Sequence, residues 1–80
     1  MKFNKWLDTF IDEKNINTDI TFEIPGPSGT NYIPIACILY VIKGASVTEQ
    51  KIIQQTIVMI DFQDGDVTHY FKHLAQAIAI

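Results

Sequence analysis

Hydrophobic and polar positions recur with two different periods in the first half of the chain, and each period predicts a type of element. Apolar residues at helical spacing, beginning at Phe3, indicate an amphipathic helix with Asn4 as its N-cap. Ile20 to Ile24 alternate between apolar and polar, which is typical of a half-buried strand. An isolated strand cannot satisfy its own backbone, so a second strand is expected beyond the turn-forming residues that follow. The predicted elements are a helix over 4–14, strands over 20–24 and 30–33, and a loop over 25–29.

An almost continuous apolar run follows the predicted hairpin. Pro34 suits the first turn of a helix, because the amide hydrogen it lacks would be unpaired there, and Gly44 suits a left-handed C-terminal stop. The helix predicted over 35–43 is apolar nearly all round, so we expect it to form the centre of the core or part of an interface. Cys37 lies inside this run and is expected to pack as a small buried hydrophobe.

Two further helices are predicted in the second half of the chain. Ser46 and Glu49 have the spacing of a capping box, which predicts a helix that begins at Val47. The β-branched residues of 56–62 also permit a strand that pairs with 20–24, but the capping box and the helical period favour a helix. The apolar face of this helix is predicted to be Ile52, Ile53, Ile57 and Ile60.

Asp66 is the predicted N-cap of a last helix over 67–79, after a break at Gln63-Asp64-Gly65. Its inward residues are predicted to be Val67, Tyr70, Phe71, Leu74 and Ile78. The resulting order α-β-β-α-α-α is a mostly helical α+β fold in one small globular domain over 1–80. The first choices for the core are Trp6, Phe10, Phe22, Phe71 and Leu74.

The amino-acid composition indicates which kinds of partner the surface could bind. Of the 80 residues, 48% are hydrophobic, which is more than a small core requires, and a partner or oligomer interface is the usual place for the surplus. The net charge is −3, the six cations are scattered lysines, and there is no arginine. These features argue against direct nucleic-acid binding, which normally shows a basic stripe with arginine.

The expected location is the cytoplasm. The longest apolar run, 35–42, is far shorter than the roughly 20 residues that span a bilayer, so no membrane association is expected. The N-terminus lacks the apolar core of a signal peptide, and a single cysteine excludes an internal disulfide and fits a reducing compartment.

No catalytic constellation is present, so we predict a protein that is not an enzyme and has no cofactor. His69 and His73 are four residues apart on a predicted helix, with Asp66 one turn earlier, and such a set could bind zinc. However, the glutamate of an H-E-x-x-H pattern is missing, Lys72 adds positive charge and Asp66 already serves as a cap. We therefore assign no metal ligands and keep a small metal-binding protein as a less favoured alternative.

Acidic residues concentrate in the first half of the chain and suggest a contact surface. A concentrated acidic face can steer a protein toward a basic partner, and a loop stiffened by prolines loses little entropy on binding. The predicted partner-binding residues are Asp8, Asp12, Glu13, Glu23, Pro27 and Ser28.

In size, acidity and lack of an active site, the chain resembles the small accessory proteins of phages and prophages. That resemblance implies an inhibitor or modulator of a larger, nucleic-acid-handling protein machine, as anti-CRISPR proteins are. We therefore predict a non-enzymatic, intracellular protein-binding module with a protein partner. The alternative is a self-associating assembly subunit that uses the 35–42 helix or residues 75–80 as a symmetric interface.

Overall fold

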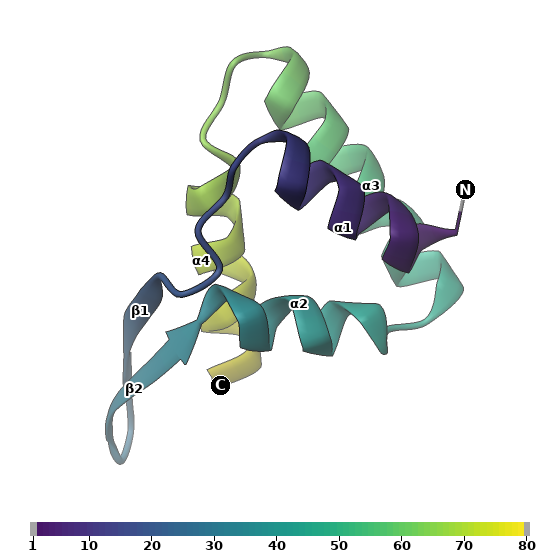
Figure 1. Cartoon of the computed structure of the whole chain (residues 1–80). Helices are drawn as coiled ribbons and strands as arrows, with labels where there is room; N and C mark the ends of the chain where they lie inside the picture. Colours follow the sequence, from purple (N-terminus) through teal and green to yellow (C-terminus); the bar gives the residue numbers. More distant parts are fainter. Residues whose placement is uncertain (1, 80) are drawn as a thin grey trace.

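The computed structural model of the protein describes residues 2–79 and has the predicted α-β-β-α-α-α order, an α+β fold (Figure 1). The 56–62 segment is helical, so the helix interpretation was right and the strand alternative wrong. The elements are α1 (Phe3–Glu13), β1 (Thr21–Gly26), β2 (Gly29–Pro34), α2 (Ile35–Lys43), α3 (Val47–Phe62) and α4 (Val67–Ala79).

The hairpin is tighter than predicted, because its strands extend into the expected loop. Pro25 pairs with Thr30, and Gly26 pairs with Gly29, so that only Pro27 and Ser28 connect the strands. Gly29 has a φ of 124°, a conformation that glycine adopts without the steric cost of a Cβ. The five-residue loop predicted over 25–29 is therefore a two-residue turn at the tip of an antiparallel ribbon.

The hairpin projects away from the four helices, and its base is fixed to them (Figure 1). β1 contacts α4, and β2 leads directly into α2 and packs against it. The amide of Ile35 donates a hydrogen bond of 2.9 Å to the carbonyl of Ile20, which joins the start of α2 to the segment before β1. The turn residues lie at the far end of this projection.

Two of the predicted helix caps at the N-terminus of a helix are confirmed. In the capping box, the Glu49 amide donates to Ser46 Oγ at 3.2 Å, and that hydroxyl donates to Glu49 Oε1 at 2.7 Å. At the start of α4, the His69 amide donates to Asp66 Oδ1 at 3.2 Å. These side chains satisfy amides that have no partner inside the helix.

Two other terminal predictions were wrong. α1 begins at Phe3 with Lys2 as its N-cap, and Asn4 lies inside the helix, because the Lys2 carbonyl already accepts the first helical hydrogen bond. Gly44 has a φ of −91° and not a left-handed conformation. Its amide closes a tight turn to the carbonyl of Val41 at 3.1 Å, which needs no positive φ.

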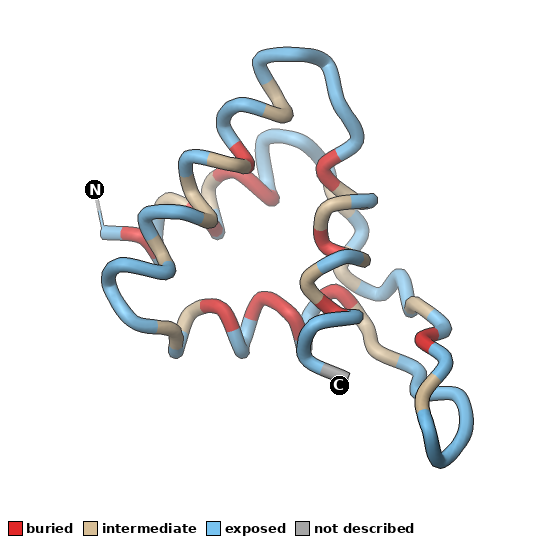
Figure 2. Tube along the Cα trace, turned by 180° about the vertical axis from the view of Figure 1, so that it is seen from behind, coloured by how far each residue is buried: buried red, intermediate tan, exposed pale blue. Residues whose placement is uncertain are grey.

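The core lies where the four helices meet (Figure 2). Each helix contributes at least one side chain that is almost completely inaccessible to solvent. These side chains are Leu7 of α1, Ile35 and Ile38 of α2, Ile57 of α3 and Phe71 of α4.

The predicted core is confirmed in part. Phe10 and Phe71 are buried, whereas Trp6, Phe22 and Leu74 are half-buried and pack against the margin of the core. On α4, Val67 and Phe71 are buried and Tyr70 and Leu74 are half-buried. Ile78 was predicted to face inward but is 43% exposed, because it lies nearly one helical turn beyond Ala75, where α4 extends past the core.

Candidate functional site

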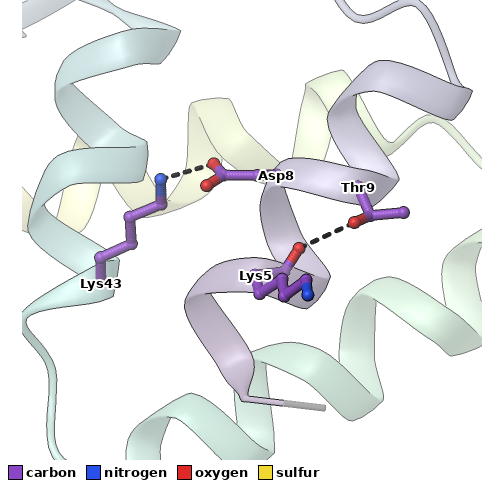
Figure 3. A network of polar contacts seen from close by, with 4 residues as sticks. All are labelled: Lys5, Asp8, Thr9 and Lys43. Carbon is purple, nitrogen blue, oxygen red and sulfur yellow. Dashed lines mark hydrogen bonds and ion pairs between the residues drawn. The ribbon is translucent and has the colours of Figure 1, made fainter.

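The predicted acidic residues of α1 are on the surface, but one of them is already paired. Asp8, Asp12 and Glu13 are all exposed. The Lys43 Nζ lies 2.5 Å from Asp8 Oδ1, so the carboxylate of α1 faces the last residue of α2 (Figure 3). This ion pair cancels one charge of the predicted acidic surface, which leaves Asp12 and Glu13 as its contribution from α1.

The remaining predicted contact residues lie on the hairpin. Glu23 on β1 and both turn residues, Pro27 and Ser28, are exposed. The turn is well separated from α1 in both views of the molecule (Figures 1 and 2). The structure thus divides the six predicted residues between two separate places, α1 and the hairpin, and does not bring them together into one surface.

α2 carries apolar side chains on two opposite faces. Its inward face consists of Ile35, Ile38, Leu39 and Ile42, which are buried. Its outward face, defined as Ala36, Cys37, Tyr40 and Val41, is exposed. Tyr40 is 82% exposed. The prediction that Cys37 packs in the interior was wrong: its thiol is exposed, because position 37 is about half a helical turn from the row of buried residues.

α3 repeats this two-faced arrangement. Ile53, Ile57 and Ile60 face inward as predicted. Ile52, predicted to join them, is 58% exposed. Neighbouring residues on a helix project about 100° apart, and the packing of α3 against α1 and α4 places Ile53, and not Ile52, on the inward side. The outward face of α3 is defined as Ile52, Val58, Met59 and Phe62, and all four are at least half exposed.

The two apolar runs that carry most of these outward faces are free of charged residues. Neither 35–42 nor 52–60 contains a lysine, arginine, aspartate or glutamate. Asp61, which follows the second run, forms an ion pair of 3.0 Å with Lys14, the residue that follows α1. Phe62, at the end of α3, is 88% exposed. Lys51, seven residues before Val58, is exposed on the same side of α3, so a contact on this face would bury apolar area next to a single charge.

The apolar pattern of the sequence already indicates that these two helices have a second apolar face. A helix with one buried face needs apolar residues on only one side. The segments 35–42 and 52–60, however, have apolar residues on both sides of the helix. For α2, the sequence allowed either a central core helix or an interface. The structure has one face in the core and the opposite face exposed.

Buried polar groups and clusters of possible metal ligands were sought among the described residues as candidate sites. No buried polar or charged side chain occurs among residues 2–79. Lys2, Phe3, Asn4 and Gln50 line a shallow hollow on the surface. Within the same residues, no group of three or more histidine, cysteine, aspartate or glutamate side chains is placed to hold a metal ion.

Comparison with protein families, curated proteins and solved structures finds no match to this chain. None of the helices described between residues 2 and 79 combines the length and apolar character needed to cross a membrane. The arrangement of the surface is therefore the basis for assigning a function.

Proposed function

We propose that this protein is a binding module that contacts an apolar surface of a partner protein through the outward faces of α2 and α3. The observation that carries the proposal is the position of two large aromatic side chains. Tyr40 on α2 is 82% exposed and Phe62 on α3 is 88% exposed, each among other exposed apolar residues. A small domain gains nothing in its own stability from such side chains in water.

The energetics of association favour these faces over the acidic residues. Burying a side chain such as Phe62 contributes about 1.5–3 kcal/mol. The centres of protein interfaces are enriched in tyrosine, phenylalanine and methionine and depleted in charge, as the two faces are. Exposed carboxylates such as Asp12 and Glu13 would mainly affect the rate of encounter with a basic partner.

The composition of the surface also indicates the kind of partner. An uncharged apolar face is matched by an apolar patch or groove on another protein, and not by phosphate groups. The more specific role predicted above, inhibition of a nucleic-acid-handling machine by a phage-type accessory protein, stays a prediction. It depends on the identity of the partner.

Self-association is the second candidate, and the spacing of α3 favours it. Ile52 and Val58 lie three residues on either side of the exposed Gln55. Two antiparallel α3 helices related by a two-fold axis at Gln55 would bring Ile52 of one copy next to Val58 of the other. Light scattering during size exclusion tests this, because a mass of one chain at tens of micromolar contradicts self-association.

Site-specific photo-crosslinking tests the main proposal. The photoreactive residue p-benzoylphenylalanine replaces Phe62 in one variant and Gln76, an exposed polar residue of α4, in a control variant. The expected result in lysate from cells that contain the protein is one crosslinked partner from position 62 and none from position 76. Equal crosslinking from both positions contradicts the proposed surface.

Affinity measurements with the purified partner then separate the apolar surface from the acidic one. Phe62→Ser and Tyr40→Ser should each weaken binding at least about tenfold, because each removes a large exposed aromatic side chain from its outward face. The charge-reversal variant Asp12→Lys/Glu13→Lys should keep the wild-type dissociation rate. The opposite pattern would assign the contact to the acidic residues of α1.

A further inference from the structure

His69 and His73 bring two ring nitrogens together on the surface of α4. Both residues are exposed and lie one helical turn apart. Their Nε2 atoms are 3.1 Å apart, the ring centroids are 4.6 Å apart, and the ring planes make an angle of 84°. The outermost nitrogen of each imidazole thus faces the other.

The separation of the two nitrogens is that of neighbouring ligands of one metal ion. Imidazole nitrogen binds zinc at about 2.0–2.1 Å, so a spacing of 3.1 Å corresponds to an N–metal–N angle of about 100°. That angle lies between those of square-planar and tetrahedral sites. Both nitrogens can therefore reach the same ion with adjustment of the rings alone, while the main chain of α4 stays in place.

We propose that His69 and His73 form a two-ligand binding site for a late first-row divalent cation, that is Cu²⁺, Ni²⁺ or Zn²⁺. Imidazole suits these ions, whereas Mg²⁺ and Ca²⁺ prefer oxygen ligands. The remaining coordination positions are taken by water. Asp66 does not complete the site, because its carboxylate accepts a hydrogen bond from the His69 amide.

Lys72 is three residues after His69 and next to His73, so its positive charge lies near the site and lowers its affinity for a cation without blocking either ring nitrogen. The histidines lie on the side of α4 opposite Phe71, which is completely buried and anchors the helix to the core. The fold therefore holds the two imidazoles in register on a helix that is fixed at its inner face.

Metal binding should depend on the folded state. In the free protein, the imidazole that carries its proton on Nε2 can donate a hydrogen bond to the Nε2 of the other imidazole. The two rings are then different tautomers, because the accepting ring must carry its proton on Nδ1. An ion replaces this hydrogen bond, with both rings then carrying the proton on Nδ1. Because the unfolded chain does not hold the rings one turn apart, the ion binds the folded chain more tightly and stabilises it.

Thermal unfolding of the full chain with NiCl₂ tests the site. At a free Ni²⁺ concentration ten times the Kd measured by titration calorimetry, the folded-to-unfolded ratio should rise about 11-fold. For a domain of this size, that change corresponds to an increase in Tm of about 5–10 °C. MgCl₂ at the same concentration should leave the Tm unchanged. A wild-type protein with no Ni²⁺-dependent shift overturns the proposal.

Single and register-shifted variants show whether these two residues are the ligands. His69→Ala and His73→Ala should fold normally, since both positions are exposed on a helix, and each should lose the Ni²⁺ shift. The double variant His69→Ala/Ala77→His recreates a pair four residues apart, with His73, at another exposed position, and should recover the shift. A Ni²⁺-dependent increase in Tm that persists in either single variant contradicts the proposal. The absence of this increase in the double variant contradicts it as well.

Discussion

Gly65 packs directly against Ile60 at the end of α3. The Gly65 amide donates a hydrogen bond of 2.7 Å to the Ile60 carbonyl, and a Cβ on Gly65 would lie only 2.8 Å from Ile60 Cγ2. The Asp64 amide donates to the Asp61 carbonyl at 3.1 Å, and Asp64 has a φ of 53°. These are the two hydrogen bonds and the left-handed residue of a Schellman motif, which ends α3 and turns the chain toward α4.

Gly65→Ala should destabilise the protein by about 1–3 kcal/mol. The added methyl group would displace the Ile60 side chain, which packs against the core, or break the short hydrogen bond between the two residues. Urea unfolding followed by circular dichroism measures the change. Gly44→Ala is the matched control, because a Cβ there would meet its nearest atom at an ordinary 3.5 Å. Equal midpoints for the two variants would contradict the close packing at Gly65.

Asp64→Gly should instead stabilise the protein, by about 0.5–1 kcal/mol. A left-handed conformation costs about 1–2 kcal/mol for a residue with a Cβ, and the extra freedom of glycine in the unfolded chain offsets part of that gain. The same urea measurement detects the change as a higher midpoint. Asp64→Ala keeps the Cβ and should not gain stability, so a similar increase in both variants would assign the effect to the loss of the carboxylate.

Local signals in the sequence were sufficient to predict the order and type of the elements. Ser46 with Glu49, and Asp66 before α4, act within one helical turn, and the structure has both caps. The end of α1 is also local, since Asn15, directly after the predicted range 4–14, has a φ of 53° and closes a second Schellman motif. Such features depend on neighbouring residues alone, so a single sequence contains them.

The direction of apolar side chains was harder to predict, because it depends on which helices meet. Ile52 and Ile53 are identical residues on one helix, and the packing of α3 against α1 and α4 decides which of them is buried. Cys37 is exposed for the same kind of reason on α2. The outward face of α3 was therefore not predicted, and an interface on α2 was predicted only as one of two alternatives. Charged residues can be identified as exposed without knowledge of the fold, so the predicted contact residues were mainly charged.

The two faces of α3 predict opposite results for one type of substitution. Ile57→Ala should cost about 2–5 kcal/mol, because Ile57 is completely buried and its removal leaves a cavity. Ile52→Ala should change stability by no more than about 0.5 kcal/mol, since the side chain is 58% exposed. Both variants replace the same residue type in the same helix, so helix propensity cancels between them. Equal losses in urea unfolding would mean that Ile52 also packs in the core.

The ion pair between α1 and α2 should contribute little to stability. Asp8 is 62% exposed and Lys43 is 29% exposed, so water and salt screen their attraction. Asp8→Ala should therefore lower the free energy of unfolding by less than about 1 kcal/mol. The effect should shrink further in 1 M NaCl. A larger loss that is independent of salt would indicate that Asp8 stabilises the protein in some way other than through its charge.

The thiol of Cys37 reports directly on the outward face of α2. Because Cys37 is exposed next to Ala36 and Tyr40, a maleimide reagent should modify the native protein nearly as fast as it modifies the chain in urea. Binding of the partner should slow the native reaction, since the proposed contact covers this face. Cys37→Ser removes the only cysteine and should show no labelling in either state. If the thiol reacts only after unfolding, its exposed position is contradicted. If the partner does not slow labelling of the native protein, this part of α2 is excluded from the contact.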